Sequence, residues 1–156
     1  MRKVSAGISS SIVVLIIFLV ALSDQISKFF VVKFLHAGEC AYVWPFFNLV
    51  NVKNSGITFG LLNGAFQPII FISVSLVIIA FIGVWIKNNR LYRFSGSLII
   101  GGAIGNLIDR IIHKAVIDFL DFHLLTYHWP AFNIADSTIV IGGGILFFIS
   151  YGEEKR

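Results

Sequence analysis

Residues 66–86 read FQPIIFISVSLVIIAFIGVWI and lie inside a longer stretch, Asn54–Ile86, that contains no Asp, Glu, Lys or Arg. An α-helix needs about 20 mostly apolar residues to cross the roughly 30 Å hydrocarbon layer of a membrane. Three further uncharged stretches lie at Val4–Ser23, Phe94–Ile108 and Ser137–Gly152. We therefore predict an all-α membrane protein with four transmembrane helices, at about 8–33, 66–87, 94–113 and 134–151.

The composition agrees with a membrane-embedded chain. Of the 156 residues, 57% are hydrophobic and 13% are charged, whereas soluble domains usually carry about 25% charged residues. The net charge of +4 is small and its basic residues are scattered, so nothing suggests a nucleic-acid partner. Cys40 is the only cysteine, which excludes an internal disulfide and a CxxC motif; its role is not indicated. We expect one domain over residues 1–156.

The first apolar stretch has an alternative interpretation. Arg2 and Lys3 precede an apolar run that ends in Ala21-Leu22-Ser23, as in a cleavable signal peptide. However, Asp24 and Lys28 continue the helix at ion-pair spacing, and three more apolar stretches follow. We favour a transmembrane helix that is retained.

Basic residues predict the orientation of the chain. Four spans place both termini and the loop at 87–93 on one side, which then carries seven Lys and Arg residues against five on the other. Cytoplasmic segments carry the excess of Lys and Arg. We therefore expect cytoplasmic termini.

All the aspartates are predicted at or beyond the outer interface: Asp24, Asp109, Asp118, Asp121 and Asp136. The 17 residues from Arg93 to Arg110 span about 26 Å at roughly 1.5 Å per residue, so the end of the third helix reaches that side. Ionisable groups at membrane depth are functional-site candidates, although helix caps and interfacial ion pairs would also explain them.

Two groups of polar residues share helix faces at this end. Asn106, Asp109 and Arg110 lie at positions i, i+3 and i+4 of the third helix, and Asn133 and Asp136 lie at i and i+3 around the start of the fourth. Small residues recur every four positions in Ser97–Gly105, and 142–144 are glycines. Such patterns let helices approach closely, which would bring Asp136 near Asp118.

Residues 39–56 are extended in character and contain Pro45 and several aromatic residues. We predict a small external β-like flap that leans on the lipid headgroups, with its aromatic side chains as anchors. Asn54-Ser55-Gly56 marks a turn at its end.

The residues alone leave three functions open. Two facing carboxylates share a proton and can hydrolyse an amide with one charged and one neutral member, and the sequence does not decide which is the base. Alternatively, the protein is a non-enzymatic scaffold or proton-relay subunit. A third possibility is a metal-dependent lipid-head-group enzyme with Asp118, Asp121 and Asp136 as ligands. His123 and His128, five residues apart, are a weak zinc signal.

Five motifs occur together across nearly the whole chain. They are Asp24-Gln-Ile-Ser-Lys28, Asn54-Ser-Gly-Ile-Thr-Phe-Gly60, Gly105-Asn-Leu-Ile-Asp-Arg110, Val116-Ile-Asp118-Phe and Phe132-Asn-Ile-Ala-Asp136. In these motifs and in length the sequence closely resembles the lipoprotein signal peptidases (signal peptidase II), the membrane aspartyl proteases of bacteria. It departs from them at Ile57-Thr58, where small residues are frequent.

The resemblance implies specific roles. Asp118 and Asp136 match the family's catalytic pair, and the residues that match its substrate-binding or supporting positions are Asn54, Asn106, Arg110, Asn133, Asp24, Lys28 and Asp109. It implies an enzyme of the bacterial inner membrane, with its active site at the outer face, that cleaves prolipoproteins just before a diacylglyceryl-modified cysteine. It also implies contact with membrane lipids, inhibition by globomycin-type cyclic peptides, and no metal or other cofactor.

Overall fold

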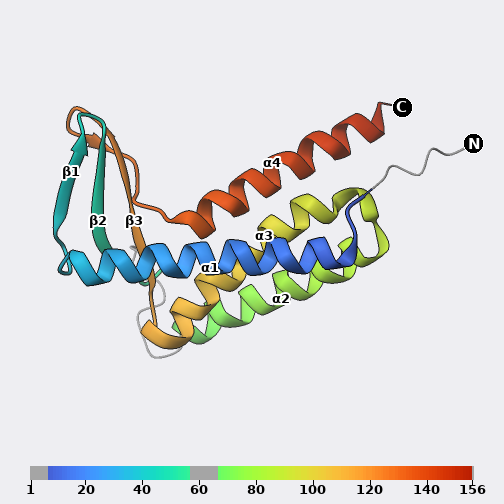
Figure 1. The fold of residues 1–156 in the computed structure, drawn as a ribbon, viewed down its shortest axis with the longest axis horizontal. Coiled ribbons are helices and arrows are strands. Elements are labelled where there is room, and N and C mark those ends of the chain that lie inside the picture. Colours follow the sequence, from blue (N-terminus) through green and yellow to red (C-terminus); the bar gives the residue numbers. More distant parts are fainter. Residues whose placement is uncertain (1–6, 57–66, 156) are drawn as a thin grey trace, which may run out of the picture.

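The computed structural model describes residues 7–56 and 67–155, which form four long helices, a short 3₁₀ turn and four strands (Figure 1). The helices are α1 (Ser10–Phe34), α2 (Gln67–Asn88), α3 (Arg93–His113) and α4 (Ile134–Glu154), and η1 (Arg90–Tyr92) precedes α3. The strands are β1 (Cys40–Trp44), β2 (Phe47–Asn54), β3 (Val116–Leu124) and β4 (Tyr127–His128). Every predicted helix end lies within three residues of the observed one.

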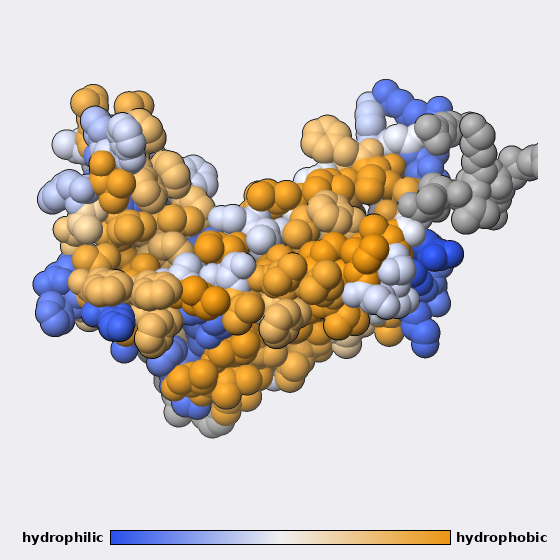
Figure 2. All heavy atoms as spheres, in the orientation of Figure 1, coloured by the Kyte–Doolittle hydropathy of each residue, from blue (hydrophilic) through white to orange (hydrophobic). Residues whose placement is uncertain are grey.

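Helices α1, α2 and α4 carry most of their apolar residues outward, as expected for spans in lipid, whereas α3 is mostly buried between them. All four described helices are long and apolar enough to cross a membrane. In Figure 2 hydrophobic residues cover the middle of the helical part, and hydrophilic residues gather toward its two ends. Helix α1 continues through Ser23 and packs against α3, which supports its interpretation as a span.

Helix α3 is the centre of the bundle and packs against each of the other three helices. Its small residues serve two faces. A Cβ on Gly101 would lie 2.7 Å from Val20 of α1, whereas a Cβ on Gly102 would meet the carbonyl oxygen of Ala135 in α4. The predicted close packing of α3 and α4 is confirmed. The prediction that the small-residue repeat in Ser97–Gly105 packs against the fourth helix was wrong, however, because Gly101 and Gly105 face α1.

A four-stranded antiparallel sheet, in the order β1-β2-β3-β4, stands at one end of the bundle (Figure 1). The β-like character predicted for residues 39–56 is confirmed by the β1–β2 hairpin. The prediction of a flap confined to that connection was wrong, because the connection between α3 and α4 adds β3 and β4. Residues 116–119 are buried without alternation, so the period of two that identifies a half-exposed strand is missing.

Candidate functional site

At the sheet end of the bundle, mostly buried side chains from α1, α3, α4 and the sheet form one hydrogen-bonded network. It joins four of the five aspartates, and each comes from a different element: Asp24 from α1, Asp109 from α3, Asp118 from β3 and Asp136 from α4. The fifth, Asp121, has other partners, described below.

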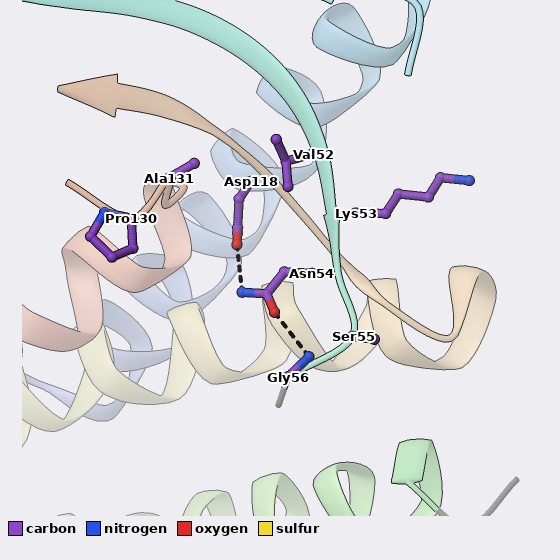
Figure 3. Close-up of a pocket in the computed structure, with 8 residues that line it drawn as sticks. All are labelled: Val52, Lys53, Asn54, Ser55, Gly56, Asp118, Pro130 and Ala131. Carbon is purple, nitrogen blue, oxygen red and sulfur yellow. Dashed lines mark hydrogen bonds between the residues drawn. The ribbon is translucent and has the colours of Figure 1, made fainter. Parts of the chain in front are cut away.

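Asp118 is 2% exposed and accepts hydrogen bonds on both carboxylate oxygens. Asn54 Nδ2 donates to Oδ2 at 2.8 Å, and Asn133 Nδ2 donates to Oδ1 at 2.8 Å. Figure 3 shows the Asn54 and Asp118 side chains pointing toward each other at a cavity of about 360 Å³. The backbone amide of Gly56 donates to Asn54 Oδ1 at 2.9 Å, which fixes the orientation of the Asn54 amide and confirms the predicted turn.

Burial raises the pKa of Asp118 from 3.8 to about 6. The hydrogen bond from Asn54 acts in the opposite direction, and the nearby carboxylate of Asp136 adds to the increase. Because a charged carboxylate is costly away from water, Asp118 binds a proton more readily than an ordinary aspartate.

Asp136 is held by the local structure that starts α4. Asn133 is the N-cap: its Oδ1 accepts from the Asp136 backbone amide at 2.9 Å, while Asp136 Oδ2 accepts from the Asn133 backbone amide at 3.3 Å. This reciprocal capping box satisfies two amides of the first turn. Asn106 Nδ2 donates to the other oxygen, Oδ1, at 2.8 Å. Asp136 also lines a second, mostly apolar cavity of about 340 Å³ with Trp129 and residues of α4.

Asn133 connects the two predicted catalytic aspartates. Its side chain is fully buried and donates to Asp118 through Nδ2, while its Oδ1 and backbone amide bond Asp136. One asparagine therefore holds the beginning of β3 against the start of α4. The aspartates are neighbours, and each lines a different cavity.

Lys28, Asp24 and Asp109 form a buried charged cluster beneath this pair, and all are 2% exposed or less. Lys28 Nζ lies 2.7 Å from Asp24 Oδ2 and 2.8 Å from Asp109 Oδ2. It also donates to Asn106 Oδ1 at 3.1 Å. Because Asn106 Oδ1 accepts from Lys28, its Nδ2 is directed to Asp136, so the cluster orients a donor on the second aspartate.

The same cluster connects the elements around the site. Asp24 Oδ1 accepts from the Ala135 backbone amide at 2.9 Å, and Asp109 Oδ2 accepts from the Ile117 amide at 3.0 Å. Carboxylates of α1 and α3 thus fix the chain next to each predicted catalytic aspartate.

Arg110 is half-buried, with its guanidinium 5.4 Å from the centre of the Phe71 ring in α2. It donates a long hydrogen bond of 3.5 Å to the Asn106 carbonyl oxygen.

With Arg110 in place, the structure brings together all nine predicted site residues at one end of the bundle. The position at which this sequence departs from the family's pattern, Ile57-Thr58, lies outside the described residues.

Sequence reasoning missed Gln25. Its Nε2 donates to Asp109 Oδ1 at 2.9 Å and to the Gly105 carbonyl oxygen at 3.1 Å. Its position next to Asp24 in the first motif was the available signal. Only the packing of α1 on α3 shows which groups it reaches.

Asp121 does not join the other aspartates as a metal ligand. It accepts from Asn48 Nδ2 at 3.0 Å and pairs with His128 Nδ1 at 2.9 Å. Burial raises its pKa, but the hydrogen bonds from Asn48 and His128 outweigh burial and leave the pKa below its usual value. Among the described residues, no group of three or more His, Cys, Asp or Glu side chains could hold a metal ion. The proposed ligand set of Asp118, Asp121 and Asp136 therefore has no support.

Comparisons with known proteins agree on one family. A family model described as signal peptidase (SPase) II matches residues 16–151. The lipoprotein signal peptidase of Thermodesulfovibrio yellowstonii is 46% identical over 142 residues, which cover 89% of this chain and 92% of the relative. That of Syntrophotalea carbinolica is 43% identical over 151 residues, which cover 93% and 94%.

Solved structures of the same shape are also found. A bacterial membrane enzyme determined by the in meso method at 2.3 Å resolution has a TM-score of 0.80 and 29% sequence identity, covering 96% of this chain and 93% of that chain. A second, at 1.9 Å resolution, has the same TM-score and 30% identity.

Proposed function

This chain belongs to the signal peptidase II family, and from that premise we propose that it is an aspartyl endopeptidase of diacylglyceryl-modified prolipoproteins. It removes the signal peptide just before the lipidated cysteine. The observation that carries the proposal is the pair Asp118 and Asp136, held as neighbours by Asn133 and each opening to a cavity.

The two aspartates have different surroundings, which support different roles. Asp118 is nearly fully buried and its pKa is about 6, so it carries the proton that the pair shares. Asp136 lies in the first turn of α4, where its two carboxylate oxygens accept hydrogen bonds from Asn106 Nδ2 and the Asn133 backbone amide, and we assign it the role of the base. Asp136 then takes a proton from the attacking water, while Asp118 donates to the carbonyl oxygen of the scissile bond.

The cavities fit the two halves of such a substrate. The cavity at Asp118 is bounded by backbone and polar groups of 52–56, which suits an extended peptide. The cavity at Asp136 is lined by Trp129, Phe132 and apolar residues of α4, which suits an acyl chain. The lipid thus stays in an apolar environment while its peptide bond reaches the aspartates.

The remaining site residues position this pair. Asn54, Asn106 and Asn133 hold the carboxylates through their amides, and the buried cluster of Asp24, Lys28 and Asp109 holds the elements that carry them, with Arg110 as the nearby positive charge. We place the sheet end at the outer face of the bacterial inner membrane and both termini in the cytoplasm. Globomycin-type cyclic peptides are expected to compete for the two cavities.

The experiment is processing of a diacylated precursor by the purified chain in lipid vesicles, with and without globomycin. Asp118→Asn and Asp136→Asn should each lower the rate by roughly 10²–10⁴-fold, the usual contribution of a general acid or base. The control is Glu39→Gln, which alters a carboxylate at the sheet end that accepts a hydrogen bond from the backbone amide of His36. Normal processing by either aspartate variant would disprove the proposal.

A further inference from the structure

The β3–β4 hairpin places two imidazole rings side by side, away from the network around Asp118. His123 and His128 are direct cross-strand partners in this hairpin. Their ring centroids are 4.8 Å apart, with 22° between the planes. The turn between the strands contains Leu125 in the left-handed conformation (φ 55°), so the chain reverses within a few residues and fixes this pairing.

Both rings have the same nitrogen engaged by an acceptor. His128 Nδ1 lies 2.9 Å from Asp121 Oδ1 and 3.0 Å from Oδ2, and His123 Nδ1 lies 3.3 Å from the Leu125 carbonyl oxygen. Carboxylate and carbonyl oxygens only accept hydrogen bonds in this setting, so Nδ1 is the protonated nitrogen of each ring. The lone pair of each imidazole is therefore on Nε2.

The Nε2 atom of His123 is buried and has no hydrogen-bond partner among the described residues. Buried polar atoms without a partner are rare and require an explanation. Asp121, which accepts from His128 Nδ1, is itself held in place, because Asn48 Nδ2 donates to Asp121 Oδ2 at 3.0 Å. The hairpin thus presents two paired imidazoles with preset tautomers.

We propose that His123 and His128 bind one divalent transition-metal ion, of the Zn²⁺ class, through their Nε2 atoms. Histidine ligands of metals almost always donate their other ring N–H to a carboxylate or a backbone carbonyl, and these two rings do both. Zn–N bonds are about 2.0–2.1 Å long, so the rings, whose centroids are 4.8 Å apart, must turn toward each other for both Nε2 atoms to reach one ion and for the His123 Nε2 atom to leave its buried position. Water completes the coordination, so binding is weaker than at a four-ligand structural site.

The ion would act on the sheet and not on the catalytic pair. It ties β4 to β3, and Trp129 directly follows His128 and donates its backbone N–H to the Phe122 carbonyl oxygen at 2.8 Å. Trp129 lines both the cavity at Asp136 and a further cavity of about 270 Å³ on the sheet, which His123 also lines. Metal binding would therefore stiffen the β3–β4 hairpin next to Trp129, and with it one side of the cavity at Asp136.

The test measures Zn²⁺ binding to the full chain in detergent, purified without a polyhistidine tag, by calorimetry. Co²⁺ absorption serves as a second readout of nitrogen ligands. The parent should bind about one ion per chain, and the double variant His123→Ala/His128→Ala should bind at least about tenfold more weakly. The matched control is His36→Ala/His113→Ala, which removes the two other histidines of the chain, both exposed, and should bind as the parent does.

A second variant covers the case in which the double variant is poorly folded. Asp121→Asn keeps both imidazoles but weakens the acceptor on His128, and loss of such a partner usually costs about 10–100-fold in metal affinity. Absence of saturable Zn²⁺ binding to the parent, or equal affinity in the parent and both hairpin variants, would overturn the proposal.

Discussion

Replacing Asn54 by alanine should move the pH dependence of catalysis in a defined direction. The Asn54 amide donates to Asp118 Oδ2 at 2.8 Å and lowers the pKa of that carboxyl. Without it the pKa rises above its present value of about 6. Because the mechanism needs the proton on Asp118, the alkaline decline of kcat/KM should move to higher pH.

The size of the shift follows from the strength of that bond. A hydrogen bond to a charged group contributes roughly 1.5–3 kcal/mol, and one pKa unit equals about 1.36 kcal/mol, so complete loss would give about 1–2 units. Asn54 is exposed at the cavity, where water replaces part of the interaction, and we therefore expect a shift of about 1 unit or less.

The assay compares pH profiles of kcat/KM for cleavage of a diacylated peptide in detergent. Ser55→Ala is the matched control, since Ser55 lines the same cavity and is not among the groups that shift the pKa of Asp118. Its profile should match the parent's even if its rate differs. An Asn54→Ala profile that is unmoved, or moved to lower pH, would refute the assignment of the shared proton to Asp118.

The buried cluster and the glycines give two further predictions. Lys28→Met leaves the carboxylates of Asp24 and Asp109 without their counter-ion and should cost roughly 3–5 kcal/mol of stability, seen as a lower thermal midpoint in detergent; an unchanged midpoint would contradict the ion pairing. Gly105→Ala puts a Cβ 2.5 Å from Asp24 Oδ2 and should cost about 1–3 kcal/mol, whereas Gly143→Ala meets nothing within 4 Å and should stay within about 1 kcal/mol of the parent. Equal losses in the two alanine variants would argue against this packing.

The positions of the four helices followed directly from the sequence. Membrane spans depend on local composition, since about 20 apolar residues suffice to identify each one. The gathering of aspartates at one end of the bundle also followed, because helical rise converts residue number into distance along each helix. The strands after α3 could not be predicted from the sequence, because β3 pairs with residues that lie more than sixty positions earlier in the chain. Phe122 of β3, for example, pairs with Phe47 of β2.

The sequence by itself determined the family, the spans and the identity of the polar residues at one end of the bundle. Only the tertiary structure decided how these residues connect: Asn133 between the two aspartates, Lys28 orienting Asn106, and Gln25 joining the buried cluster. The physical reason is the range of the interactions. Apolar length and helix periodicity are local properties of the chain, whereas a buried hydrogen bond requires two distant segments to pack in one register and leave each donor facing one acceptor.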